Sequence, residues 1–317
     1  MMTADHQARY QTLLTRAQGL VAIPMAVVHP CDAASLQGVI VAMDAKLITP
    51  TLIGPKAKIL AAAAQLGADL SAKISQMHLI DVPHSHAAAA EAVAQVRAGH
   101  AEALMKGSLH TDELMQEVVA LNTGLRTGRR MSHVFYADVP SYPKPLFITD
   151  AAINIEPTLD DKTDIVQNAI DLARILGVKE PKVAILAAVE TISSKMRATT
   201  DAASLCKMAD RGQITGGILD GPLAFDNAIS LVAAKSKNIT SPVAGNADIL
   251  VVPDIESGNI LAKQLAYLGN ALLAGVVAGA RVPIVLTSRA DTAEARSASC
   301  VIALLMAHAK RAATLQV

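Results

Sequence analysis

The chain has 317 residues, of which 52% are hydrophobic, 18% are charged and 2% are aromatic. This balance excludes a disordered protein, and the length predicts two domains of about 150 residues each. Lysine plus arginine and aspartate plus glutamate each number 28, so no net charge draws the chain to nucleic acid or to an anionic membrane. The longest apolar run, residues 271–280, is too short to span a bilayer. Three widely spaced cysteines predict free thiols and a cytoplasmic protein.

The first part of the chain alternates between helical and strand patterns. Helices are expected at residues 5–18, 33–45, 55–66, 85–98 and 111–122. Strands are expected between them, at residues 24–28, 51–53, 77–82 and 103–105. This alternation predicts an α/β protein with a parallel sheet that is covered by helices on both faces.

The second part continues the alternation after a hairpin. Residues 134–137 and 146–149 read as two strands around a proline-rich segment, and Thr158 with Asp161 predicts a capping box for the next helix, which Gly177 ends. Further strands are expected at 183–188, 217–219 and 249–252, with a helix at 201–210. A last strand at 282–286 and its helix would return to the first lobe. We therefore expect one domain of residues 1–134 with 281–317, and a second of residues 135–280.

The segment VPIVLTSRADTAEARSA, residues 282–298, combines an apolar strand with a polar turn and a helix start. Ser288 with Asp291, and Asp291 with Glu294, have the spacing of a helix N-terminus, where free amide groups and the helix dipole favour an anion. Arg289 adds donors whose geometry suits phosphate. The alternative is structural: these residues only cap a helix, and Arg289 pairs with a surface carboxylate. Ligands in α/β sheets usually bind to residues that follow strands, so the position of this turn supports the anion-site hypothesis.

Other polar groups follow the expected strands or lie between regular elements. Lys106 and Gly107 end the fourth strand, and the loop LNTGLRTGRRMS carries Arg129 and Arg130 among glycines. Such a loop is either an anion clamp or a solvated connection. His84 and His86 are two residues apart on an expected helix and point to nearly opposite faces, so no metal site is expected there. The dinucleotide fingerprint GxGxxG follows none of the strands, which removes the usual support for a nicotinamide cofactor.

Seven stretches, taken together and in order, resemble one family. They are LMKGSLHTDELM (104–115), GLRTGRRMSHV (124–134), TDAAINIEPTLDDKTDIVQNAIDLA (149–173), AILAAVETISSKMRATTDAASLCKMADRG (184–212), ILDGPLAFDNAIS (218–230), SPVAGNADILVVPDIESGNIL (241–261) and PIVLTSRADTAEARS (283–297). These stretches resemble the phosphate acetyl/butyryltransferases. LTSRAD and GPLAFDNAIS look closer to the phosphate butyryltransferase branch.

The resemblance implies reversible transfer of an acetyl, propionyl or butyryl group between CoA and orthophosphate. It also implies two α/β lobes of the isocitrate/isopropylmalate dehydrogenase type, with an interdomain cleft and a homodimer or higher homo-oligomer formed through the second domain. CoA is then a substrate, and neither a cofactor nor a metal is needed. Nucleic acid and membrane are not expected partners.

The resemblance assigns roles to particular residues. Ser288 would stabilise the transition state and Arg289 would hold phosphate. The family's general base, an aspartate seven positions after that serine, is replaced here by Ala295, so Glu294 and Asp291 are the substitutes. Substrate binding is assigned to Lys106, Gly107, Arg129, Arg130, Asp150 and Asn154.

Two alternatives remain open. A dehydrogenase dependent on NAD or NADP could share this architecture, because a fold does not fix a function. A non-catalytic acyl-CoA-binding protein is the second alternative, and the alanine at position 295 motivates it.

Overall fold

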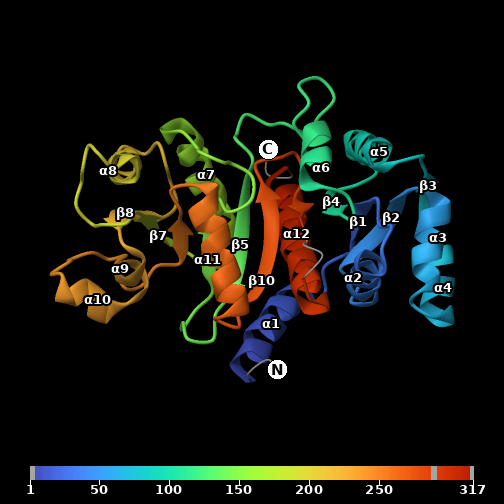
Figure 1. Ribbon diagram of the computed structural model, residues 1–317, viewed down its shortest axis with the longest axis horizontal. Helices are drawn as coiled ribbons and strands as arrows, with labels where there is room; N and C mark the ends of the chain where they lie inside the picture. Colours follow the sequence, from blue (N-terminus) through green and yellow to red (C-terminus); the bar gives the residue numbers. More distant parts are fainter. Residues whose placement is uncertain (1–3, 287–290, 315–317) are drawn as a thin grey trace. The chain divides into compact units, whose positions relative to one another are not determined.

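The computed structural model describes residues 4–286 and 291–314, and it is an α/β protein (Figure 1). The chain forms two compact lobes, and the first helix, α1 (Ala4–Ala17), is divided between them. The first lobe comprises Tyr10–Arg129 and Ala274–Val317, and the second comprises Arg130–Leu273 together with the residues up to Arg9. Among the residues described, no helix is both long and apolar enough to cross a bilayer.

The first lobe is built on a mostly parallel sheet with the strand order β3-β2-β1-β4-β11-β10. Its strands are β1 (Ile23–Val28), β2 (Ile48–Gly54), β3 (His78–Asp81), β4 (Ala103–Lys106), β10 (Leu272–Ala278) and β11 (Ile284–Val285). Its helices are α2 (Ala33–Asp44), α3 (Lys56–Ala64), α4 (Ala68–Ser75), α5 (Ser85–Arg97), α6 (Thr111–Val118) and α12 (Ala293–Thr314). All four residues of β4 are buried, as expected of a strand covered on both faces.

The second lobe has the strand order β5-β6-β9-β7-β8. Its strands are β5 (Ser132–Asp138), β6 (Leu146–Thr149), β7 (Lys182–Leu186), β8 (Ile218–Leu223) and β9 (Ile249–Val251). Its helices are α7 (Leu159–Ile175), α8 (Arg197–Asp210), α9 (Phe225–Ile229), α10 (Leu231–Ser236) and α11 (Ile255–Tyr267). The expected hairpin is confirmed, because β5 and β6 pair antiparallel.

The sequence predictions of strand and helix hold for most of the chain, with three corrections. The sheets are mixed rather than purely parallel, because β5 pairs antiparallel with β6 and β10 with β11. Five elements were not expected: α4, α9, α10, α11 and β10. Helix α6 also ends at Val118, earlier than the predicted Asn122.

Local sequence signals explain why α7 begins and ends where it does. The Thr158 hydroxyl accepts a hydrogen bond from the Asp161 amide at 3.2 Å, and the Asp161 carboxylate accepts one from the Thr158 amide at 3.0 Å. This reciprocal arrangement is the predicted capping box. Gly177 follows the C-cap residue with a φ of 95°, a left-handed conformation that suits glycine.

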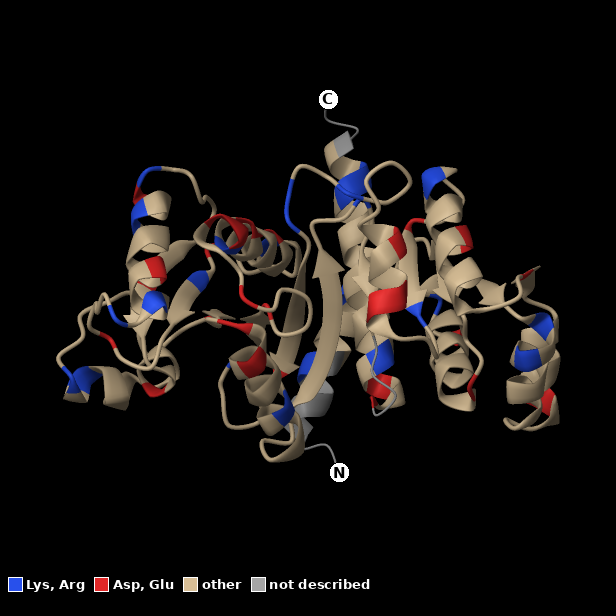
Figure 2. Cartoon of the chain, turned by 45° about the horizontal axis from the view of Figure 1, so that its top comes forward, with Lys and Arg blue, Asp and Glu red and all other residues tan. Residues whose placement is uncertain are grey.

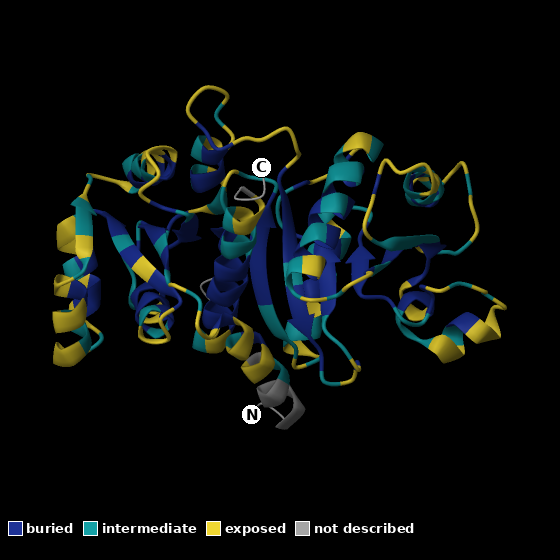
Figure 3. Ribbon diagram, turned by 180° about the vertical axis from the view of Figure 1, so that it is seen from behind, coloured by how far each residue is buried: buried dark blue, intermediate teal, exposed yellow. Residues whose placement is uncertain are grey.

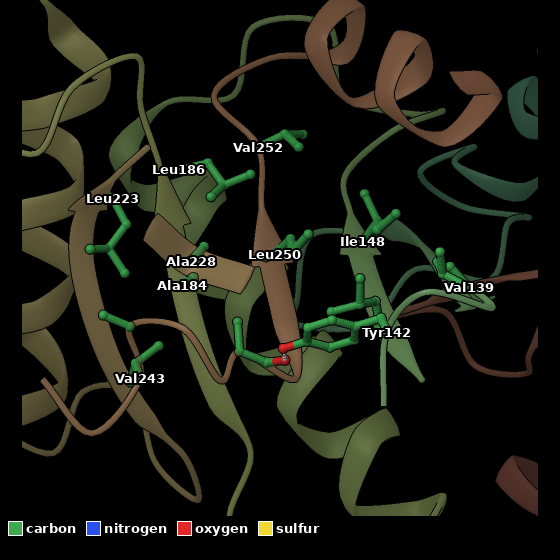
Figure 4. Packing of buried hydrophobic residues seen from close by; sticks show 14 of the residues in the cluster. Val139, Tyr142, Ile148, Ala184, Leu186, Leu223, Ala228, Val243, Leu250 and Val252 are labelled. Atoms are coloured by element: carbon green, nitrogen blue, oxygen red, sulfur yellow. Dashed lines mark hydrogen bonds between the residues drawn. The ribbon is translucent and has the colours of Figure 1, made fainter. Parts of the chain in front are cut away.

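A cluster of buried apolar side chains forms the core of the second lobe (Figure 4). Ile148, Leu250 and Ala184 come from three neighbouring strands, and Leu223 and Val243 extend the cluster. Tyr142 closes one side, and its hydroxyl donates to the Ala247 carbonyl at 2.8 Å. The strand residues of this cluster are two apart where a strand contributes more than one, so the cluster lies on one face of the sheet.

Burial and charge follow the same division between sheets and helices. Most strands are buried, whereas the helices carry exposed side chains (Figure 3). Acidic and basic side chains are interspersed over the helices, and the strands are almost free of them (Figure 2). A charged side chain at the end of a strand is therefore unusual in this protein, and such residues are candidates for a functional role.

Candidate active site

The carboxyl ends of β1 and β4 form the switch point of the first lobe's sheet. β1 pairs with β2 on one side and with β4 on the other, in parallel. From β1 the chain proceeds to β2 and β3 in one direction, whereas β4 and β11 lie in the other. In open α/β sheets the crevice outside such a switch point is the usual ligand position.

Backbone hydrogen bonds tie the two strand ends together. The Gly107 amide donates to the Val28 carbonyl and the Ser108 amide to the His29 carbonyl, each at 2.9 Å. The Ser108 hydroxyl donates to the His29 carbonyl at 2.9 Å and accepts from the Cys31 amide at 3.0 Å. A Cβ on Gly107 would lie 2.6 Å from the Val28 carbonyl oxygen, so only glycine fits this crossing.

Two titratable side chains lie beside this crossing, and neither is charged at neutral pH. Burial, with a smaller effect of the Lys58 charge, lowers the pKa of His29. Burial raises the pKa of the Cys31 thiol to about 11, so this sulfur is protonated and a poor nucleophile. Covalent catalysis by Cys31 is not favoured by this environment.

Lys106 places an ammonium group at the end of β4. The residue is only 8% exposed, and its Nζ donates to the Leu109 carbonyl at 3.1 Å and to the Gly107 carbonyl at 3.4 Å. Both of these acceptors are backbone carbonyl oxygens, which carry no formal charge.

Strand β11 pairs with β4 and ends shortly before Ser288 and Arg289 in the chain. Ile284 and Val285 pair in parallel with Leu104 and Met105. Ser288 and Arg289 themselves lie outside the described residues. Helix α12 begins at Ala293, two residues later than expected, because Thr292 rather than Asp291 accepts the cap hydrogen bond, from the Ala295 amide at 3.2 Å.

A second group of predicted residues forms one buried network in the second lobe. The Asp150 carboxylate accepts from the Ala152 amide at 2.9 Å, from the Ile153 amide at 3.1 Å and from the Asn154 side chain at 2.5 Å. Burial raises the pKa of Asp150, and these hydrogen bonds oppose that effect. The carboxylate therefore acts as the centre around which residues 150–154 fold.

Asn154 connects this loop to Arg130. Its Oδ1 accepts from Arg130 Nε at 2.7 Å, and its Nδ2 also donates to the Met131 carbonyl at 2.9 Å. A guanidinium nitrogen of Arg130 lies 3.4 Å from an Asp161 carboxylate oxygen. The structure thus brings Arg130, Asp150 and Asn154 together. Arg129 belongs to the first lobe, where its amide donates to the Thr127 hydroxyl at 3.1 Å.

A family model described as "Phosphate acetyl/butaryl transferase" matches residues 84–304, which is more than half of the chain. The chain belongs to this transferase family. The match begins before β4 and ends within α12, so it includes the Ser288 and Arg289 segment and the Asp150 network. The family resemblance inferred from the seven sequence stretches is confirmed.

Similar proteins carry both names of the phosphate acetyl/butyryl transferase family. A phosphate acetyltransferase from Rhizobium meliloti is 59% identical over 96% of this chain and 96% of the relative. A phosphate butyryltransferase from Clostridium beijerinckii is 39% identical over 94% and 97%. A solved structure, a branched-chain phosphotransacylase from Enterococcus faecalis V583, matches with a TM-score of 0.78 and 31% identity over 90% and 99%. These names do not favour the butyryltransferase branch over the acetyltransferase branch.

The start of α12 is where this chain departs from the family, because Ala295 stands in place of the aspartate that would act as the general base. Ala295 is buried, so the position of the missing aspartate faces the interior of the protein. Glu294 lies in the first turn of α12 and is exposed, whereas Asp291 precedes the helix and is half-buried.

Sequence reasoning missed one charged residue of this region, Arg296. It is 3% exposed and lies on α12 directly after the alanine at position 295. The available signal was an arginine at the start of the apolar helical stretch ARSASCVIALLM, where a charge is unusual. His133 was also missed: it is fully buried next to Phe135, and burial lowers its pKa to about 4.

The expectation that His84 and His86 do not bind a metal stays a prediction. The His84 ring accepts from the Ala87 amide as the N-cap of α5, and His86 lies 3.7 Å from the Glu113 carboxylate. Among the residues that the structure describes, no three His, Cys, Asp or Glu side chains are arranged to hold a metal ion.

Proposed function

We propose that this chain catalyses the reversible transfer of an acetyl, propionyl or butyryl group between CoA and orthophosphate. The observation that carries the proposal is its membership of the phosphate acetyl/butyryl transferase family over a match that includes the Ser288 and Arg289 segment. The buried Lys106 ammonium at the neighbouring strand end supports the same reading, because a dianionic substrate needs positive charge at its site.

The proposed reaction gives each residue a defined task. Orthophosphate carries about two negative charges at neutral pH, and Arg289 would orient one of its oxygens toward the thioester carbon. That oxygen attacks, the carbon–sulfur bond breaks, and the departing CoA sulfur takes the proton that phosphate loses. Ser288 would donate a hydrogen bond to the oxyanion that develops on the thioester oxygen. Glu294 or Asp291 would relay this proton from phosphate to the sulfur, and in the reverse direction would accept it from the thiol and return it to phosphate.

The finer features of the proposal rest on the family resemblance. The two lobes would be of the isocitrate/isopropylmalate dehydrogenase type, with the active-site cleft which that type implies. Lys106, Gly107, Arg129, Arg130, Asp150 and Asn154 would bind substrate, and CoA would be a substrate with no further cofactor. The three cysteines are free thiols, which suits a cytoplasmic location.

Thiol release from acetyl-, propionyl- and butyryl-CoA, each with and without phosphate, tests the function. The proposal expects phosphate-dependent release, and the three rates give the acyl preference. A protein that binds acyl-CoA without releasing thiol would be the non-catalytic alternative. Reduction of NAD or NADP with a hydroxy acid, in the absence of phosphate-dependent thiol release, would favour the dehydrogenase.

The second lobe would form the homodimer, and helix α11 offers the surface. Glu256, Ile260, Lys263 and Tyr267 are all exposed and lie on one stripe at helical spacing. Ile260 is 65% exposed and Tyr267 71%, which is unusual for apolar side chains of this size. Beside this stripe lies an apolar hollow of about 760 Å³, lined among others by Leu186, Phe225, Pro253, Leu261, Leu265 and Leu268.

A second copy of this chain fits that surface. Glu256 and Lys263 are about two helical turns apart, so an antiparallel pair of α11 helices centred near Ile260 sets each Glu256 against Lys263 of the second copy. The same pairing brings Leu268 of one copy toward Pro253 at the hollow of the other. A two-fold interface of this kind uses one surface twice, and a stable one covers about 800 Å² per partner.

Replacing Ile260 with glutamate is expected to weaken this dimer about 10-fold or more. The substitution places two carboxylates next to each other at the two-fold axis, where they repel and are desolvated. Sedimentation velocity over a dilution series measures the change. Val21→Glu is the matched control, since Val21 is 71% exposed in the first lobe. A wild-type protein that sediments as a 33.0 kDa monomer at all concentrations would contradict the dimer.

A further inference from the structure

A glycine in the middle of α2 makes room for a buried arginine. Gly38 lies inside the helix, where glycine is less favourable than alanine because it loses more backbone freedom on folding. A Cβ at this position would lie 2.7 Å from Cδ of Arg296 and 3.6 Å from Cε of Met105. Glycine is therefore needed at position 38 because the aliphatic part of the Arg296 side chain occupies the space that a Cβ would take.

Arg296 itself occupies an unusual place for a charged residue. It is 3% exposed in the first part of α12, and the next residues of that helix are also buried. Its Nε donates to the Asp291 carbonyl at 3.3 Å, and its amide donates to the Thr292 carbonyl at 3.1 Å. Burying a guanidinium is costly unless its donors are used, and the Asp291 carbonyl is one acceptor that Arg296 uses.

The contact with Asp291 links Arg296 to the residues of the proposed phosphate site. Asp291 is the first described residue after the Ser288 and Arg289 segment, and Thr292 caps the helix that follows. The peptide that Arg296 holds is thus the point where this segment joins α12. Met105, which contacts the same space, precedes Lys106 at the end of β4.

We propose that Arg296 is a positioning residue for the proposed phosphate site: its buried guanidinium, seated in the space left by Gly38, holds the Asp291 peptide, which follows Ser288 and Arg289 in the chain and precedes α12. This inference rests on the proposed function for its catalytic consequence. The contacts from Gly38 to Arg296 and from Arg296 to Asp291 do not depend on that function.

Arg296→Met keeps the buried aliphatic volume and removes the donors. We expect a loss of about 10- to 100-fold in kcat/KM for phosphate, because a misplacement of about 1 Å in a positioning element costs this much. The loss should appear mainly in the kinetics with phosphate, and Arg296→Lys should recover part of it. Arg311→Met is the matched control: Arg311 is on the same helix, pairs with Glu102 at 2.6 Å and lies far along the chain from the site.

A double-mutant cycle separates positioning from general loss of stability. Gly38→Ala adds a methyl group that pushes Arg296 aside, so it should lower kcat/KM for phosphate without changing any functional group. In an Arg296→Ala background the space is free, and Gly38→Ala should then have no further effect. Additive losses in the two backgrounds would mean that Gly38 acts elsewhere, and they would overturn the link.

Amide hydrogen exchange gives a readout that does not require activity. In Arg296→Met and Gly38→Ala, the amides of Ala295 and Arg296 should exchange faster than in wild type, and in Arg311→Met they should not. If the wild type lacks phosphate-dependent activity, the proposed function fails while exchange still decides the positioning claim. Unchanged exchange at both amides, or wild-type kinetics in Arg296→Met, would overturn the inference.

Discussion

Replacing Arg289 with alanine is expected to lower phosphate-dependent thiol release by about 10²- to 10³-fold, the size of effect seen when a positioned donor is removed from an anion site. The guanidinium fork of arginine offers two parallel hydrogen bonds to phosphate, and alanine offers none. Steady-state kinetics over a phosphate titration measure the loss. The unfolding midpoint should change little.

Arg281→Ala is the control for this substitution. Arg281 is an exposed arginine shortly before β11, and its amide donates to the Leu125 carbonyl at 2.9 Å. Its removal should leave the phosphate titration as in wild type. An Arg289→Ala enzyme that keeps the wild-type kcat/KM for phosphate would refute the assignment of the phosphate site.

Replacing Asp201 with alanine is expected to lower the free energy of unfolding by about 3–5 kcal/mol, because it strands a buried cation. Lys162 on α7 donates to the Asp201 carboxylate on α8 at 2.8 Å, and the two side chains are only 5% and 10% exposed. Arg197 lies 3.4 Å from the same carboxylate. Denaturant unfolding followed by circular dichroism measures the change.

The same helix provides the control for Asp201. Lys207 and Asp210 pair at 2.6 Å but are 67% and 64% exposed, so Asp210→Ala should change the free energy of unfolding little. Combining Asp201→Ala with Lys162→Met should recover most of the lost stability, because no unpaired charge then remains buried. Equal losses for Asp201→Ala and Asp210→Ala would show that burial does not set the strength of these pairs.

The fold was predictable where apolar periodicity and capping signals agreed. The hairpin of β5 and β6 and the capping box of Thr158 with Asp161 were predicted from such signals. Helix α11 was missed because Pro253 and Asp254 read as the end of a strand, and the exposed Ile260, Tyr267 and Leu268 blur its polar face. Strand β10 was taken only as an apolar run, and its antiparallel pairing with β11, which follows shortly in the chain, was not predicted.

Individual residues of the candidate site were predictable from the sequence, but the contacts between them were not. Lys106 and Gly107 were expected at a strand end, and the structure places them at the switch point beside β1. The network of Arg130, Asp150 and Asn154 depends on a loop folded around one carboxylate, which no spacing rule gives. Gly38 and Arg296 are far apart in the chain, so their contact could be found only from coordinates.

The ratio of acyl phosphate formed to CoA thiol released is the most direct test of the account. Purified protein is incubated with acetyl-CoA and phosphate, and both products are measured over time. The proposed transfer predicts one acyl phosphate for each thiol, and neither product when phosphate is left out. Thiol release at the same rate without phosphate, with no acyl phosphate formed, would mean that water rather than phosphate accepts the acyl group.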